Sequence, residues 1–378
     1  MRFGATILDA EGLRLTADEK ALFREAAPFG FILFARNIDS ADQLRALCDE
    51  FRAAAGHDCL ITIDQEGGRV QRLRAPLARE WRPALDHVEA ASDPMRAMYL
   101  RARLIAAELH DLGIDSNCAP LADVAGAGTH PFLRNRCYGT DAADVAAIAR
   151  ACAEGHLDGG VVPVMKHIPG HGRSTMDSHH DLPHVTAPAE VLRAEDFAAF
   201  AQLRDLPMAM TAHLVYDAFD PRPATLSPVM MQVIRQELGY DGLVMTDDIS
   251  MKALWAPELQ QPEQRPSLGG DEAPSRQTGG LSSTKREGRA LSGLRPDDPD
   301  MAAGAIARAS LDAGCDVALF CNSSLSARAA VVEAAGLMTD AAQRRAEAAL
   351  ACRQTPAALD TEAVEAELSA LMGGQVYG

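Results

Sequence analysis

Short apolar runs recur along the chain and alternate with longer amphipathic stretches, and this alternation constrains the fold more than any other feature. Eight runs resemble buried strands in length and composition: Phe3–Leu8, Gly30–Phe34, Leu60–Ile63, Asp115–Pro120, Val161–Met165, Ala209–Thr211, Leu243–Thr246 and Val317–Phe320. The stretches between them are rich in Ala, Leu, Arg and Glu, as at Ala41–Ala55, Pro94–Leu112, Ala142–Leu157 and Ala187–Leu203. Strands that alternate with helices form parallel sheets, so the pattern predicts an α/β fold of the (β/α)8 TIM-barrel type. The alternative is an open doubly wound sheet. Such a sheet usually carries a glycine-rich phosphate turn after its first strand, and no GxGxxG follows Leu8.

We expect one catalytic barrel domain over residues 1–378, with one interruption. Residues 256–300 are dense in Pro, Gly, Ser, Gln and charged residues, so they bury too little apolar surface to offset the entropy of ordering. This composition predicts a disordered insert after the seventh strand. The helical pattern resumes at Met301–Ala313, and a C-terminal helical segment is expected over residues 339–372.

Charge and apolar patterning argue against several classes of partner. The formal net charge of −17 and the isoelectric point of about 5.0 disfavour binding to nucleic acid or to an anionic membrane. No apolar run is long enough to span a bilayer, and Asp9 and Glu11 interrupt the N-terminal region before a signal-peptide core is complete. The eight cysteines are scattered without CxxC spacing, as expected for reduced core residues. These features predict a cytoplasmic protein.

Polar residues collect where the predicted strands end. They are Arg36-Asn37, Asp64-Gln65-Glu66-Gly67-Gly68-Arg69, Asp123, Lys166-His167, His213, Asp247-Asp248 and Asn322. Because the carboxyl ends of all strands meet at one mouth of a parallel barrel, this set predicts a polar pocket there, typical of a sugar or polar-metabolite site. Asp247 and Asp248 are the most informative pair. One acid suffices to cap the following helix, and the other is then available for a second role.

The loop after the fifth strand, residues 166–181, contains four histidines and two aspartates. A metal-dependent barrel hydrolase would use His167, His171, His179 and His180. Against this, Pro-Gly at 169–170 interrupts any helix that would place the first two on one face, and no His-x-His follows the first strand.

Acid–base chemistry is the other interpretation of this loop. Asp177 precedes His179 by two residues, so its carboxylate can bond one ring nitrogen and raise the pKa of the imidazole. On these residues alone, a solvated His–Asp pair on a surface loop is favoured over a catalytic pair. A sugar-binding barrel that does not catalyse a reaction is a third alternative, and the set of Asp177, His179 and Asp247 argues against it.

Four segments together resemble a known family. They are Ile-Asp-Gln-Glu-Gly-Gly-Arg-Val-Gln-Arg (63–72), Lys-His-Ile-Pro-Gly-His-Gly (166–172), Asp-Ser-His (177–179) and Thr-Asp-Asp-Ile-Ser-Met (246–251). In this order they resemble the family 3 glycoside hydrolases, and more closely the single-domain bacterial β-N-acetylglucosaminidases (β-hexosaminidases) of peptidoglycan recycling. The resemblance covers residues 3–255 and resumes near residue 301, and the insert at 256–300 departs from the family pattern.

The resemblance implies a retaining exo-β-N-acetylglucosaminidase that acts on muropeptide fragments without a cofactor or metal. Matched to the family motifs, Asp247 is the nucleophile, and His179 with Asp177 is the acid/base pair. The residues implied to bind the sugar are Asp64, Arg72, Arg136, Lys166 and His167. The family's larger members carry the proton donor on a second domain, and the residues after this barrel are too few to build one. Neither the residues nor the resemblance indicates the oligomeric state.

Overall fold

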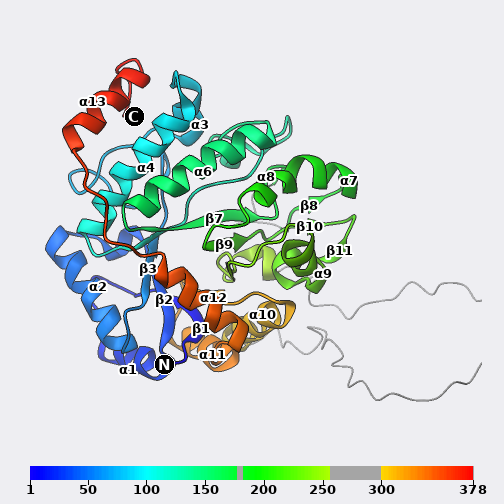
Figure 1. Cartoon of the computed structure of the whole chain (residues 1–378). Helices are drawn as coiled ribbons and strands as arrows, with labels where there is room; N and C mark the ends of the chain where they lie inside the picture. Colours follow the sequence, from blue (N-terminus) through cyan, green and yellow to red (C-terminus); the bar gives the residue numbers. More distant parts are fainter. Residues whose placement is uncertain (177–181, 256–298, 378) are drawn as a thin grey trace, which may run out of the picture.

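The computed structural model describes residues 1–176, 182–255 and 299–377, and its centre is a ring of eight parallel strands (Figure 1). The strands are β1 (Gly4–Leu8), β2 (Pro28–Leu33), β3 (Leu60–Ile63), β6 (Ser116–Asn117), β7 (Val162–Ile168), β9 (Met208–Thr211), β12 (Leu243–Met245) and β13 (Ala318–Leu319). Their order is β12-β9-β7-β6-β3-β2-β1-β13, and a parallel bridge between Met245 and Val317 closes the ring. Each predicted apolar run supplies one strand, so the predicted (β/α)8 barrel is confirmed.

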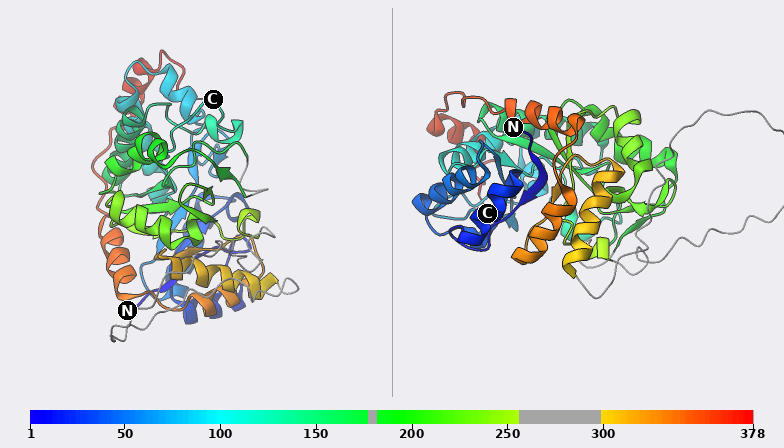
Figure 2. Two further views of the ribbon diagram at one scale, coloured as in Figure 1. Left: turned by 90° about the vertical axis from the view of Figure 1, so that its right-hand side faces the viewer. Right: turned by 90° about the horizontal axis from the view of Figure 1, so that it is seen from below.

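Helices surround this ring on its outer side (Figures 1 and 2). They are α1 (Ala17–Ala26), α2 (Ala41–Ala55), α4 (Pro94–Asp111), α6 (Ala142–Asp158), α7 (Ala189–Val191), α8 (Phe197–Gln202), α9 (Pro228–Gln232), α10 (Pro299–Ala313) and α11 (Leu325–Ala335). The stretch predicted as one helix over Ala187–Leu203 contains a π-helical turn, Leu192–Asp196, between α7 and α8.

The sequence of α2 shows why these segments become helices. Ser40 caps its start by accepting a hydrogen bond from the Gln43 amide, and Gly56 ends it in the left-handed conformation at φ 74°. The buried positions recur with helical spacing and form one face: Leu44, Leu47, Cys48, Phe51, Ala54 and Ala55. This face packs into the main apolar core together with Phe31 of β2.

Side-chain alternation along the strands divides the core and also builds the pocket. Outward-facing residues such as Ile61 and Ile63 pack against helices. Inward-facing residues such as Leu60, Val162 and Leu243 fill the barrel interior. Because every second residue of a strand faces the same side, continuing the inward series beyond this apolar layer gives a last layer of polar residues. That layer contains Asp64 after β3, Lys166 in β7 and Asp247 after β12.

Shorter elements decorate the carboxyl-terminal mouth. A hairpin of β4 (Gln65–Gly67) and β5 (Val70–Gln71) follows β3, and helix α3 (Ala84–Ala90) lies between this hairpin and α4. Helix α5 (Pro131–Arg134) lies between β6 and α6. A small sheet joins β8 (His184–Val185), β10 (Val215–Tyr216) and β11 (Asp220–Pro223) beside the ends of β7 and β9.

The C-terminal segment contains α12 (Asp340–Ala351) and α13 (Thr361–Leu371) (Figure 1). The α12 residues Ala342, Ala346 and Ala349 pack with Phe3 at the amino-terminal end of the barrel, and α13 lies against α4. None of the helices in the described part of the chain combines the length and apolarity needed to cross a lipid bilayer.

Asp316 joins strand and helix where the ring closes. Its carboxylate accepts hydrogen bonds from the Val244 amide at 2.9 Å, from Arg235 at 2.6 Å and from Arg345 of α12 at 3.0 Å. The side chain is 4% exposed, so these partners replace most of its water.

Replacing this acid should destabilise the fold. Asp316→Ala removes the acceptor of a strand amide and a buried carboxylate that pairs with Arg235 and Arg345, and we expect a loss of about 3 kcal/mol in the free energy of unfolding. Asp312→Ala removes an acid whose ion pair with Arg308 is exposed, and it should cost less than about 0.5 kcal/mol. Urea denaturation of both variants makes the comparison, and equal midpoints would contradict it.

Candidate active site

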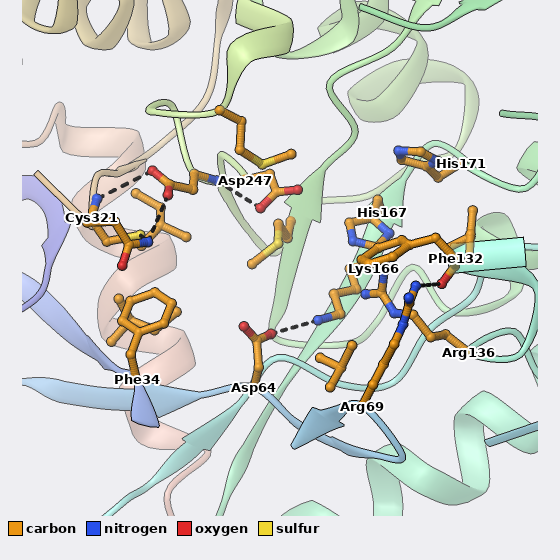
Figure 3. Close-up of a pocket in the computed structure, with 18 of the residues that line it drawn as sticks. Phe34, Asp64, Arg69, Phe132, Arg136, Lys166, His167, His171, Asp247 and Cys321 are labelled. Atoms are coloured by element: carbon orange, nitrogen blue, oxygen red, sulfur yellow. Dashed lines mark hydrogen bonds and ion pairs between the residues drawn. The ribbon is translucent and has the colours of Figure 1, made fainter. Parts of the chain in front are cut away.

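A pocket of about 300 Å³ opens at the carboxyl-terminal mouth of the barrel (Figure 3). Its polar lining consists of Asp64, Arg69, Arg72, His130, Arg136, Lys166, His167, His171, Asp247, Asp248 and Asn322. Its apolar lining includes Ile32, Phe34, Phe132, Met176, Met210, Met251, Leu319 and Cys321. The expected polar pocket at this mouth is therefore present.

Lys166 is the centre of an ion-pair network on one wall. Its Nζ lies 2.9 Å from Asp64 Oδ1 and 2.6 Å from Glu66 Oε1. The second oxygen of Asp64 accepts a hydrogen bond from Arg72 at 2.9 Å. Arg136 donates to both Glu66 oxygens, at 2.9 and 2.8 Å. Lys166 is 3% exposed and Glu66 4% exposed at the side chain, so protein charges replace water around both groups.

This network holds its members in their charged forms. Burial alone would raise the pKa of Asp64, but the charges of Lys166 and Arg72 outweigh it, and the pKa lies well below its usual value. Burial is likewise outweighed at Glu66 by Arg136 and Lys166, which lower the pKa of that carboxyl. At Lys166 burial would lower the pKa, yet the two carboxylates raise it above its usual value. Both acids are therefore ionised at neutral pH and the lysine is protonated.

The two adjacent acids after β12 have different surroundings. The carboxylate of Asp248 accepts hydrogen bonds from the Ser250 amide at 2.9 Å and hydroxyl at 2.7 Å, and from the Cys321 amide at 3.4 Å. It thus holds the turn that follows the strand. Asp247 lines the pocket, and its Oδ1 accepts a hydrogen bond from the Asp248 amide at 2.8 Å. In Figure 3, Asp247 lies across the pocket from Asp64 and Lys166.

Asp123 fixes the base of the loop after β7. This buried carboxylate lies 2.7 Å from His167 Nδ1 and accepts a hydrogen bond from the His171 amide at 2.7 Å. The contact sets the orientation of the His167 ring, which lines the pocket. Burial, reinforced by the neighbouring His167, lowers the pKa of His171 to about 4, so the His171 ring is neutral near pH 7.

The structure brings most of the predicted site residues together. Six of them line the pocket: Asp64, Arg72, Arg136, Lys166, His167 and Asp247. Asp177 and His179 lie outside the described residues. The residue before them, Met176, lines the pocket, and Leu182 packs with Val215 of β10. Met176 and Leu182, the described residues on either side of 177–181, therefore lie at the same mouth of the barrel.

Some polar residues at strand ends serve the loops and not the pocket. Arg36 forms an ion pair with Asp9. Asn37 is buried and donates to two loop carbonyls at 3.1 and 2.8 Å. His213 lies 2.7 Å from the hydroxyl of Thr225. The expectation that strand-end polar residues face the pocket is wrong for these three, because the loops at the mouth also need hydrogen-bond partners for their buried groups.

Several residues of the site had no assigned role in the sequence. Glu66 lies two residues after Asp64 in an extended segment, a spacing that favours a shared face and gives a signal for its place in the network. Phe132 stacks against Arg69, with the guanidinium carbon 3.4 Å from the ring centroid. It lies in a helix of four residues, too short to give a sequence pattern.

The metal hypothesis named four histidines, of which His179 and His180 lie outside the described residues. Among residues 1–176, 182–255 and 299–377, no three His, Cys, Asp or Glu side chains are grouped as metal ligands.

Comparison with known proteins identifies the family. The sequence model of the family described as "Glycosyl hydrolase family 3 N terminal domain" matches residues 7–269. A beta-hexosaminidase of Alkalilimnicola ehrlichii is 39% identical over 259 residues, which cover 67% of this chain and 74% of that protein. A beta-hexosaminidase of Methylococcus capsulatus is 35% identical over 332 residues, with coverage of 87% and 85%.

Solved structures give the same assignment over almost the whole chain. NagZ from Neisseria gonorrhoeae superimposes with a TM-score of 0.75 at 26% identity, covering 99% of this chain and 97% of that one. A second structure of NagZ from the same organism, in complex with N-trifluoroacetyl-D-glucosamine, gives a TM-score of 0.74 at 26% identity and the same coverage. The resemblance drawn from the sequence motifs is therefore confirmed: the chain belongs to glycosyl hydrolase family 3 and is a glycoside hydrolase.

Proposed function

We propose that this protein is a retaining exo-β-N-acetylglucosaminidase that removes terminal N-acetylglucosamine from β-linked saccharides. The main support is the position of Asp247 in a small pocket, across from the Asp64–Lys166 pair. A volume of about 300 Å³ is at the lower end for ligand sites, which suits a single terminal sugar. The beta-hexosaminidase relatives and the glucosamine-derived ligand bound by NagZ support the same sugar.

The charged wall supplies both acceptors and donors for sugar hydroxyls. Ionised Asp64 accepts hydrogen bonds from hydroxyl groups, while Lys166 and Arg136 donate to hydroxyl or acyl oxygens. Because these groups are already held by one another, little reorganisation accompanies binding. His167 adds a polar group beside them, in an orientation set by Asp123.

Asp247 serves as the nucleophile in this proposal. Its carboxylate attacks the anomeric carbon from below the ring and forms a glycosyl–enzyme bond, which water then hydrolyses. The amide of Asp248 at 2.8 Å orients this carboxylate, and Asp248 itself stays engaged with the turn. Two acids at one strand end thus divide attack and support between them.

His179, with Asp177 as its partner, provides the proton for the leaving oxygen in this proposal. The pocket acids Asp64 and Asp247 are assigned to binding and attack, and the pKa of Asp64 is too low for it to act as a proton donor near neutral pH. Met176, the residue before Asp177, lines the pocket, and this supports a role for the pair in the same reaction.

Muropeptide fragments in the cytoplasm are the substrate and the location that we propose. The resemblance to the peptidoglycan-recycling branch supports the substrate, and the acidic composition supports the location.

Hydrolysis of an aryl β-N-acetylglucosaminide tests the function. The unmodified protein should hydrolyse it equally well before and after exhaustive treatment with a chelator. Asp247→Ala should lose roughly 10³-fold or more in kcat, while still binding free N-acetylglucosamine because the Asp64–Lys166 wall is intact. Asp312→Ala, altered far from the pocket on α10, is the matched control for the loss of one acid. Equal rates for Asp247→Ala and this control would rule out Asp247 as the nucleophile.

Comparison of two leaving groups tests the proton donor. In His179→Ala, hydrolysis of an unactivated disaccharide should fall by roughly 10² to 10⁴ in kcat/KM, because its alkoxide leaving group needs a proton. A dinitrophenyl glycoside needs no such help and should lose far less. The two rates would fall in parallel if His179 only shaped the pocket, and that result would rule out the assigned role.

A further inference from the structure

A buried histidine behind the pocket takes no part in the reaction proposed above. His156 lies on α6 and is 1% exposed. Its Nε2 is 2.9 Å from the side-chain nitrogen of Asn117, which lies on β6 and is itself fully buried. Asn117 in turn grips the backbone of Gln65 in the hairpin after β3: its Oδ1 accepts from the Gln65 amide at 3.0 Å, and its Nδ2 donates to the Gln65 carbonyl at 3.1 Å.

The contacts of His156 determine which group donates and which accepts in the hydrogen bonds that link Cys152, His156, Asn117 and Gln65. His156 Nδ1 lies 2.9 Å from the carbonyl oxygen of Cys152, and because a carbonyl only accepts, Nδ1 carries the proton. In the neutral ring Nε2 is then an acceptor, and it takes the second N–H of the Asn117 amide. Burial lowers the pKa of His156 to about 4, which keeps the ring neutral at working pH. His156 thereby fixes which way the Asn117 amide points.

Gln65 occupies the position that matters for the pocket wall, because it separates Asp64 from Glu66. Its backbone is held by Asn117, and its side-chain oxygen accepts a hydrogen bond from the Arg72 amide at 3.0 Å. Gln65 thus connects the two carboxylates beside Lys166 with Arg72, which pairs with Asp64.

We propose that Asn117 and His156 form a positioning pair for the sugar-binding wall: His156 orients the Asn117 amide, which fixes the Gln65 peptide so that Asp64 and Glu66 both face Lys166. Neither member of the pair lines the pocket, so both act through Gln65. The inference rests on the proposed function, since it assumes that Asp64 and Lys166 bind the terminal sugar. Losing the pair should weaken binding of the sugar more than it slows the chemical step, because Asp247 is held by separate contacts after β12.

The test compares two replacements of His156 in the full-length protein. His156→Leu keeps the volume but removes the acceptor for Asn117. We expect KM for the aryl β-N-acetylglucosaminide, and Ki for free N-acetylglucosamine, to rise by roughly 10-fold, with kcat changed by less than about threefold. His156→Gln can offer its amide oxygen to Asn117 and should restore both constants to within about threefold of the unmodified protein.

Two further variants separate positioning from general destabilisation. His57 lies at the amino-terminal end of the barrel, where it bonds the Pro28 carbonyl at 2.9 Å and stacks on Phe3. His57→Leu should lower the melting temperature but leave KM unchanged. Asn117→Asp keeps the acceptor for the Gln65 amide and loses the donor for its carbonyl, so it should raise KM even if His156→Leu fails to fold.

KM and Ki within twofold of the unmodified protein in both His156→Leu and Asn117→Asp would overturn the positioning role. So would a rise in KM as large in His57→Leu as in His156→Leu. Absence of turnover in the unmodified protein would instead refute the proposed function, so the two failures are distinguishable.

Discussion

A lysine buried between two carboxylates is the interaction on which the pocket depends. Lys166 contacts Asp64 and Glu66 at 2.9 and 2.6 Å, and each acid has an arginine on its other side. Removing these charges from water is costly, and only nearly complete mutual pairing offsets the cost. The network therefore has one well-defined arrangement, and it presents Asp64 and Lys166 to the pocket in fixed positions. Three cations face two acids here, so the wall is locally positive in a chain whose net charge is −17.

Barrel geometry explains why this network lies at the mouth. The inward series of β7 runs Val162, Val164, Lys166, so the strand that fills the barrel interior ends in the central cation of the site. Asp247 continues the inward series of β12 in the same way. The apolar residues that fill the barrel interior and the charged residues that line the pocket are thus successive layers of the same strands. A shift of one residue in strand register would move the charged residues out of the pocket.

The eight strands and most helices could be predicted from the sequence, because apolar periodicity is local and strong in this chain. Six of the predicted site residues line the pocket, since strand-end position alone brings them to one mouth. Position at a strand end does not say where a side chain points, and for that reason Arg36 and Asn37 were misjudged: they satisfy loop groups that only the tertiary structure reveals. Glu66 and His156 were not assigned roles for a different reason. Their partners Arg136 and Asn117 are distant in the sequence, so no local pattern pairs Glu66 with Arg136 or His156 with Asn117.

The proposed reaction requires a covalent bond between the sugar and the carboxylate of Asp247 at the end of β12. Mass spectrometry of the intact protein after exposure to a slowly hydrolysed fluorinated N-acetylglucosaminide detects such a bond. We expect a mass increase of one glycosyl group, located by proteolysis on the peptide that contains Asp247. Turnover of the reagent without any adduct, or an adduct on a different peptide, would contradict it.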